Sequence, residues 1–132
     1  MTHHAEIELH VPFHDCDPMQ IVWHGNYLKY FELARTELFQ QLKLDVPEIR
    51  ALNLIMFVCE THCRYLYPLR YNDLVQVRAT ITRLEPVLRV SYAVMNLTAG
   101  RKSSRAYTEL AFTDVNGELL TTLPQVIRER LA

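Results

Sequence analysis

The chain has 132 residues, 49% hydrophobic and 22% charged, with a formal net charge of −1, a balance that indicates one globular domain and excludes a largely disordered chain. Because Lys and Arg are dispersed, the chain offers no basic surface for nucleic acid or an anionic membrane. Its longest uncharged apolar run, Ala51–Cys59, is about half the roughly 18 residues that a membrane-spanning helix needs. The first residues also lack the basic and apolar regions of a secretory signal, so we expect one cytoplasmic domain over residues 1–132.

The first predicted element is a half-buried strand. Apolar residues alternate with polar ones, at Ala5, Ile7, Leu9, Val11 and Phe13. Pro12 lacks a backbone N–H, so the strand is expected at a sheet edge, or its hydrogen-bonded ladder ends early.

A long helix is predicted over Leu28–Leu42. Apolar residues recur there at helical spacing and form a stripe that covers most of the circumference, at Tyr27, Leu28, Tyr30, Phe31, Leu33, Ala34, Leu38 and Leu42. A helix with so narrow a polar face is expected to be wrapped by other structure.

Strands dominate the rest of the chain. After a connector with one possible helical turn, Asp45–Ala51, alternating patterns predict four long strands, at Ile55–Tyr67, Leu74–Leu84, Leu88–Ala99 and Ser103–Thr113. A short sixth strand over Glu118–Thr122 and a closing helix that starts at Pro124 follow. This order predicts an α+β fold in which a curved antiparallel sheet of five to six strands wraps the central helix. The free edges of such a sheet favour pairing between two subunits.

Reactive groups are concentrated directly before the long helix. Two carboxylates, a thiol, an imidazole and a glycine occur within one short segment, at Asp15, Cys16, Asp17, His24 and Gly25. The start of a helix carries unpaired N–H groups and a partial positive charge, which suit an oxygen on which negative charge develops. The sequence therefore places any reaction site in this segment.

These residues carry a resemblance to a known family. Phe13–Pro18, Ile21–Tyr27 and Phe31–Arg35 resemble the hotdog-fold acyl-CoA thioesterases of the 4-hydroxybenzoyl-CoA thioesterase type, and the related bacterial acyl-CoA thioesterases associated with the Tol-Pal system. A second landmark of the family matches Tyr65–Pro68 and Tyr71–Val75. The resemblance implies a hotdog fold and the hydrolysis of acyl thioesters.

The resemblance also implies roles for single residues. It places the catalytic carboxylate on Asp17, as general base or as nucleophile through an anhydride, and the carbonyl-polarising N–H at His24 or Gly25. Gly25 would let a thioester approach closely, because it has no side chain. The His24 side chain could steady the leaving thiolate, deliver a proton or merely pack. Asp15 is expected to cap backbone donors of the loop, and its charge would raise one of the two carboxyl pKa values if both lie on one side.

Candidates for substrate binding lie around this segment. Val22, Trp23, Tyr27 and Phe57 could line an acyl pocket or be plain core, and Glu32 could meet a polar acyl tail or a partner subunit. A Cys16–His24 nucleophile pair is disfavoured, because an acidic neighbour raises the pKa of a thiol.

Cysteine usage gives no sign of a disulfide framework or a metal. There are three cysteines, and the spacing of Cys59 and Cys63 does not match zinc sites unless His62 joins them from the opposite face of a strand. We therefore expect structural thiols, no metal and no cofactor apart from the coenzyme A or phosphopantetheine that forms part of the substrate.

Two departures from the family pattern leave the substrate open. Bulky Met19 and Gln20 replace the small residues that often follow the catalytic aspartate, and Leu84–Leu88 lacks the basic cluster that helps to hold coenzyme A phosphates. Both coenzyme A and an acyl carrier protein remain possible carriers, and the protein is expected to be a homodimer that assembles into a homotetramer. The alternatives are a hotdog 3-hydroxyacyl dehydratase or hydratase, and a non-catalytic module that binds acyl thioesters.

Overall fold

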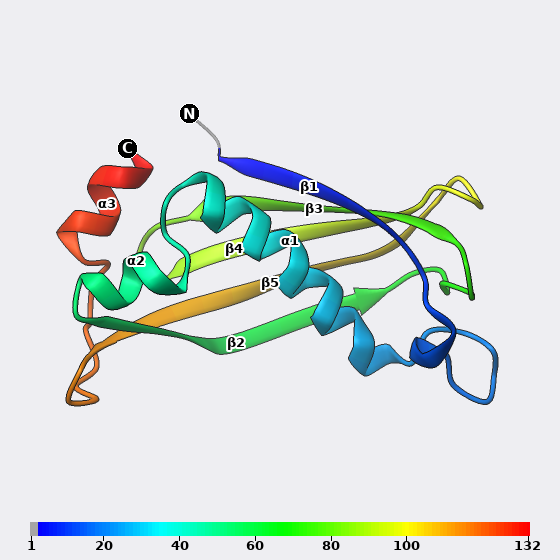
Figure 1. The fold of residues 1–132 in the computed structure, drawn as a ribbon, viewed down its shortest axis with the longest axis horizontal. Coiled ribbons are helices and arrows are strands. Elements are labelled where there is room, and N and C mark those ends of the chain that lie inside the picture. The colour runs from blue at the N-terminus through cyan, green and yellow to red at the C-terminus, as the bar shows by residue number, and fades with distance from the viewer. Residues whose placement is uncertain (1–2) are drawn as a thin grey trace.

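The computed structural model describes residues 3–132 and is built on one antiparallel sheet (Figure 1). Its strands lie in the order β1-β3-β4-β5-β2, so β1 and β2 form the edges. Their bounds are β1 (His4–His10), β2 (Leu54–Tyr65), β3 (Leu74–Arg83), β4 (Leu88–Asn96) and β5 (Arg101–Asp114). The helices are α1 (Tyr27–Gln41), α2 (Val46–Ala51) and α3 (Gln125–Leu131), with short 3₁₀ turns at η1 (Phe13–Asp15) and η2 (His24–Asn26).

The long central helix and the curved sheet confirm the predicted α+β hotdog architecture. α1 lies across one face of the sheet and contacts β1 and β3 (Figure 1). Its buried residues recur every three or four positions, at Tyr27, Tyr30, Phe31, Ala34 and Leu38, and each large buried apolar side chain contributes about 1.5–3 kcal/mol of transfer free energy. This helical periodicity explains why a single stripe of the helix anchors it to the sheet.

The helix is less enclosed within one chain than its composition suggests. Leu28 and Leu33 are each 48% exposed, although both belong to the predicted apolar stripe. The side chain of Arg35 reaches Tyr92 on β4 and Thr108 on β5. Residues seven positions apart lie on the same side of a helix, so Leu28 shares with Arg35 the flank that is turned toward β4 and β5.

Strand β2 is the uncovered edge. Within residues 3–132 it pairs only with β5, through a register shift between Val58 and Glu60, and most of its residues are exposed. Phe57 and Val58 each keep 40% of their surface accessible, and only α2 packs on this strand among the helices with substantial contacts. A long apolar edge of this kind is normally paired or covered in a folded protein.

Smaller differences from the sequence prediction have local causes. The first strand ends at His10, before Pro12, and Phe13 belongs to η1 with 76% of its surface exposed. In place of a sixth strand, residues 118–122 make one isolated bridge, Thr113 to Leu119. Pro124 caps α3 instead of forming its first residue. Within residues 3–132, no helix is both long enough and apolar enough to span a membrane.

Candidate active site

Asp17 opens a tight turn between β1 and α1. Its N–H donates to the carbonyl of Ile21 at 2.8 Å, and the N–H of Gln20 donates back to the carbonyl of Asp17 at 2.8 Å. Gln20 has a φ of 65°, which fits a three-residue hairpin loop whose last residue is left-handed. Oδ1 of Asp17 accepts the N–H of Met19 at 2.9 Å, while no described residue donates to Oδ2. One carboxylate oxygen thus fixes the turn and the other stays free.

Asp15 is a structural carboxylate, with partners other than those predicted. It is 2% exposed, and its oxygens accept hydrogen bonds from Lys29 Nζ at 2.5 Å and from the Tyr30 hydroxyl at 2.7 Å. Its backbone carbonyl accepts from Trp23 N–H at 3.0 Å and from Asn26 Nδ2 at 2.9 Å. The side chain therefore binds helix side chains, and does not cap backbone donors of the loop as we expected.

The charge environment of Asp15 also differs from the expectation of mutual repulsion. Burial raises the pKa of this carboxyl, but the hydrogen bonds from Lys29 and Tyr30 and the charges of Lys29 and His14 outweigh burial and lower it below its usual value. Burial and the bond to Asp15 raise the pKa of Tyr30, so its hydroxyl stays protonated. Asp15 is therefore held in its charged form as an anchor between the loop and α1.

The start of α1 presents free backbone donors. Tyr27 N–H bonds to the carbonyls of His24 and Gly25, and Asn26 N–H bonds to that of Trp23 at 2.8 Å. For the N–H groups of His24 and Gly25, no acceptor is found among residues 3–132. Unpaired N–H groups at a helix N-terminus form a site for negative charge.

Gly25 has a packing role that the sequence did not show. A Cβ atom at this position would lie 2.2 Å from the ring of Trp23, which covers the glycine. We expected the missing side chain to admit a thioester, but the indole of Trp23 already fills that space. The absence of a side chain at Gly25 instead lets Trp23 close over the backbone.

One cavity joins the carboxylate to the helix start. It measures about 330 Å³, and its walls include Asp17, Val22, His24, Tyr27 and Tyr65. The ring of Tyr27 is held from behind, because its hydroxyl bonds to Ser103 Oγ at 3.2 Å while Ser103 donates to the carbonyl of Tyr67 at 2.8 Å. Four of the residues singled out in the sequence, Asp17, Val22, His24 and Tyr27, therefore meet in one place.

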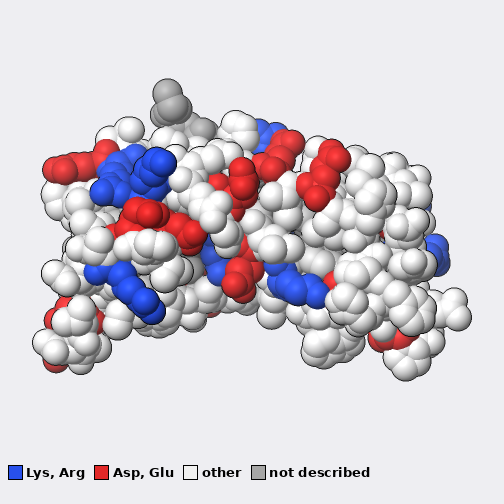
Figure 2. Space-filling view, in the orientation of Figure 1, with Lys and Arg blue, Asp and Glu red and all other residues white. Residues whose placement is uncertain are grey.

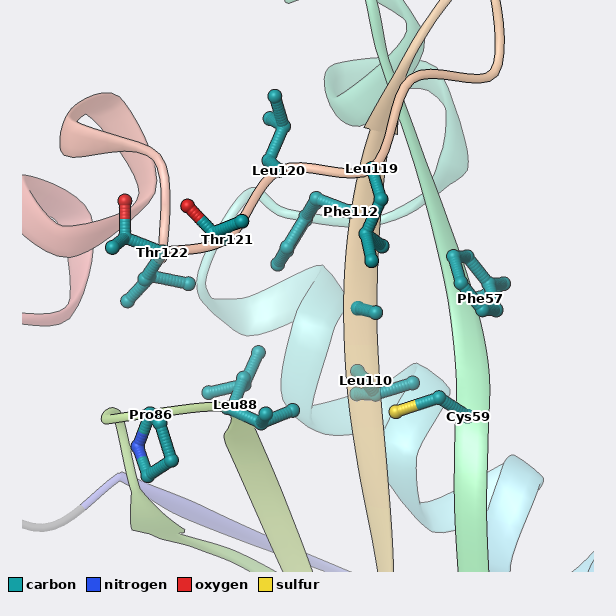
Figure 3. A pocket seen from close by; sticks show the side chains of 13 residues that line it. Phe57, Cys59, Pro86, Leu88, Leu110, Phe112, Leu119, Leu120, Thr121 and Thr122 are labelled. Atoms are coloured by element: carbon teal, nitrogen blue, oxygen red, sulfur yellow. The ribbon is translucent and has the colours of Figure 1, made fainter.

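The remaining predicted residues lie elsewhere. Trp23 is 50% exposed beside the cavity, with its ring 5.0 Å from that of His24. Glu32 lies exposed on the surface of α1. Phe57 lines a second cavity, of about 360 Å³, together with Leu110 and Leu119 (Figure 3).

Three residues that hold the site together could not be recognised in the sequence. Lys29, Tyr30 and Tyr65 bond to Asp15 or to the carbonyl of His24. The motif match at Tyr65–Pro68 was the only signal for one of them. Helical spacing indicated that Tyr30 is buried, but it could not show which group its hydroxyl meets.

The cysteines behave as structural thiols. Burial, together with the charges of Asp15 and Asp17, raises the pKa of Cys16, which disfavours the thiolate needed for a nucleophile. Burial likewise raises the pKa of Cys59 and of Cys63. No cluster of three His, Cys, Asp or Glu residues able to hold a metal occurs in the described part of the chain.

Comparison with known proteins identifies the family of the chain. The family model described as the thioesterase-like superfamily matches residues 11–131. The chain belongs to this superfamily. The match includes the loop with Asp17, the long helix and most of the sheet, and it confirms the resemblance noted in the sequence.

Similar proteins include bacterial enzymes that act on acyl-CoA. A relative from Aquifex aeolicus, named as a putative esterase, is 32% identical over 74 residues, which cover 56% of this chain and 58% of the relative. The acyl-CoA thioester hydrolase YbgC of Escherichia coli is 26% identical over 74 residues, which cover 56% of this chain and 55% of that protein. The aligned part thus spans little more than half the length of these relatives.

The fold matches that of solved thioesterases. A 4-hydroxybenzoyl-CoA thioesterase in complex with 4-hydroxybenzoyl-CoA superposes with a TM-score of 0.85 at 19% identity, with 98% of this chain and 99% of that chain covered. At this identity, the likeness concerns the fold and not the details of the site.

Proposed function

We propose that this protein hydrolyses acyl thioesters, with Asp17 as the catalytic carboxylate and a backbone N–H of His24 or Gly25 as the donor to the carbonyl oxygen. The observation that carries the proposal is the shared cavity of about 330 Å³, which Asp17 and the start of α1 both line. Asp17 and His24 line this cavity, and each has a group without a partner among the described residues, Oδ2 of Asp17 and the N–H of His24; the N–H of Gly25 follows in the chain and also has no acceptor there. Membership of the thioesterase-like superfamily supports this reaction class.

The chemistry follows from these two sides. Attack on the thioester carbonyl carbon moves negative charge onto its oxygen, which the N–H groups stabilise; loss of one such donor typically costs about 2.7–4 kcal/mol of barrier. Asp17 either takes a proton from the attacking water or attacks the carbon itself, forming an anhydride that water then opens. In both routes the C–S bond breaks and the sulfur leaves as a thiolate.

His24 is placed to assist the leaving group. Its side chain is exposed and lines the cavity, and no described residue forms a hydrogen bond with its ring. A protonated imidazole at this point could give its proton to the thiolate as it departs. The side chain of His24 is therefore proposed as the proton donor, while its backbone forms part of the oxyanion site.

Substrate binding follows the walls of the cavity. Val22 and Tyr27 are proposed to contact the acyl group, with Trp23 beside the entrance. The carrier is proposed to be coenzyme A or an acyl carrier protein. On the face that carries α1, Lys and Arg are mixed with Asp and Glu and form no large patch of one sign (Figure 2), so the charge of this face does not favour one carrier over the other. No cofactor is proposed beyond this carrier.

A homodimer is proposed as the working unit, built from single domains over residues 1–132. The edge strand β2 and the flank of α1 with Leu28 both leave apolar side chains exposed, among them Leu28, Phe57 and Val58. Pairing of β2 with the β2 of a second copy would bury that edge. Glu32 lies between Leu28 and Arg35 and is proposed to meet the partner subunit; Phe57, on β2, stays a candidate pocket residue. Two dimers are proposed to form a tetramer in the cytoplasm.

The test is thiol release from a panel of coenzyme A and carrier-protein esters, with Asp17→Asn and, as a control, Glu8→Gln on the more exposed side of β1. We expect Asp17→Asn to keep its fold and substrate affinity but lose most turnover, while Glu8→Gln behaves as wild type. Full activity of Asp17→Asn would remove Asp17 from the mechanism. Enoyl absorbance with a 3-hydroxyacyl thioester would instead indicate a dehydratase, and tight acyl-CoA binding without thiol release a binding module.

A further inference from the structure

Tyr65 connects the edge strand to the start of the helix. It is the last residue of β2, and its hydroxyl donates a hydrogen bond of 2.8 Å to the carbonyl oxygen of His24. The ring is held by aromatic contacts, edge-on to Tyr27 with centroids 4.9 Å apart and to His24 at 6.2 Å. These contacts leave the hydroxyl aimed at one atom of η2.

The bonded carbonyl belongs to the same peptide group as the N–H of Gly25. In residues 3–132 only the Glu85–Pro86 bond is cis, so the peptide between His24 and Gly25 is trans. A trans peptide is planar and carries its oxygen and its hydrogen on opposite sides. A bond that holds the oxygen of His24 therefore also sets the direction of the Gly25 N–H.

Tyr65 sets the direction of the Gly25 N–H in a way that suits an oxyanion donor. The oxygen of His24 also accepts the N–H of Tyr27, so it points along the helix. The Gly25 N–H must then point out of the helix N-terminus, where free donors are found. A hydrogen bond at the oxygen also polarises the peptide and strengthens the N–H as a donor.

Among the described residues, the other hydrogen bond to this peptide runs from the Tyr27 N–H to the His24 oxygen. η2 is a single turn, and its N-cap residue Trp23 makes no side-chain capping bond. Gly25 adds backbone freedom, because it lacks a Cβ. An oxyanion donor is effective only when its direction is fixed before the reaction, since a donor that must reorient loses much of its benefit.

We propose that Tyr65 is a positioning residue, whose hydroxyl locks the His24–Gly25 peptide so that the Gly25 N–H faces the carbonyl oxygen of the bound thioester. The inference rests on the proposed function and adds a residue to its machinery. Burial and the neighbouring Cys63 raise the pKa of Tyr65 to about 12, so the hydroxyl keeps the proton that it donates at neutral pH.

The variant that tests this is Tyr65→Phe, which keeps the ring and removes only the hydroxyl. We expect kcat to fall about 10- to 100-fold, which is no more than the fall that is typical when an oxyanion donor itself is removed. KM should change by less than about twofold. The matched control is Tyr107→Phe, which removes a 2.8 Å bond between β5 and Glu60 of β2 away from the cavity. It should leave both constants unchanged.

A second measurement does not depend on catalysis. The chain contains three glycines, so selective ¹⁵N-glycine labelling gives three backbone amide signals, with Gly100 and Gly117 as internal references. Tyr65→Phe should shift the Gly25 signal and leave the other two in place, whereas Tyr107→Phe should move none of them.

The outcomes separate the two proposals. A wild-type protein that releases no thiol from any ester would overturn the proposed function, and the Gly25 signal would then decide alone whether Tyr65 holds the peptide. An unmoved Gly25 signal, or an active enzyme with unchanged kcat in Tyr65→Phe, would overturn the role of Tyr65.

Discussion

Lys29 Nζ lies 2.5 Å from Oδ1 of Asp15 and ties the first turn of α1 to the loop that carries the candidate catalytic carboxylate. Asp15 is 2% exposed, whereas the side chain of Lys29 is 47% exposed. The lysine thus brings a solvated charge to a carboxylate that burial would otherwise penalise. Because Asp17 follows two residues later, this ion pair fixes the base of the turn on which Asp17 sits.

Replacement of Lys29 by Met should lower the free energy of unfolding at pH 7 by about 1–2 kcal/mol, since the buried carboxylate keeps Tyr30 but loses its charged partner. The effect depends on pH in a defined direction. The pKa of Asp15 in the folded protein lies below its ordinary value of 3.8, so the stabilisation is complete above about pH 5 and is lost progressively as pH falls from there through the folded pKa. Chemical denaturation at pH 7 and pH 3 measures it.

The control for this experiment is Lys102→Met, at an exposed position of β5 where no salt bridge is found among the described residues. Its unfolding free energy should stay within about 0.5 kcal/mol of wild type at both pH values. A difference between Lys29→Met and wild type that is as large at pH 3 as at pH 7 would show that the ion pair is not its source.

Gly25→Ala should move Trp23 more than it destabilises the fold. The new Cβ would lie 2.2 Å from the indole, but the ring atoms involved belong to a half-exposed side chain that can swing outward. We expect a loss of about 1 kcal/mol or less, at the lower end of overpacking costs. Trp23 is the only tryptophan, so its emission maximum should shift to longer wavelength as the ring enters solvent.

Gly117→Ala provides the contrast. A Cβ atom added there would have no neighbour within 4 Å, but the φ of 86° strains any side chain, so stability should fall by about 1 kcal/mol without a change in Trp23 emission. If Gly25→Ala left the emission unchanged and cost more than about 3 kcal/mol, the indole would be fixed and the account of Gly25 would be wrong.

Periodicity predicted the elements well, because it reports burial directly. The strand and helix patterns placed β2 to β5 and α1 within a few residues of their bounds. Contacts between side chains of different elements produce no periodic pattern in the sequence. Nothing in the spacing of Lys29 or Tyr30 indicates that both meet Asp15, and the ring of Trp23 over Gly25 depends on a turn whose path the sequence does not specify.

The predicted site residues fall into two groups, those close together in the sequence and one on a distant strand. Asp17, Val22, His24 and Tyr27 come from one loop and the helix that follows, and they meet in one cavity. Phe57 lies on β2 and lines the other cavity. Sequence proximity was a good guide to the first group. Phe57 lies near the start of β2, whereas Tyr65 at the end of the same strand lines the first cavity, so the position along the strand decides which cavity Phe57 can reach.

The proposed dimer makes Leu28 a sensitive position. Leu28 is 48% exposed on the flank of α1 that it shares with Arg35, and in the proposed dimer a carboxylate there would be buried without a partner. Leu28→Asp should therefore shift the protein to monomers at micromolar concentration in light scattering, while the helix itself tolerates an acidic residue in its first turn. Val115→Asp changes an apolar residue that is 63% exposed in a turn outside this surface, and should leave the mass unchanged. A Leu28→Asp protein with the wild-type mass would show that this flank of α1 is not the subunit interface.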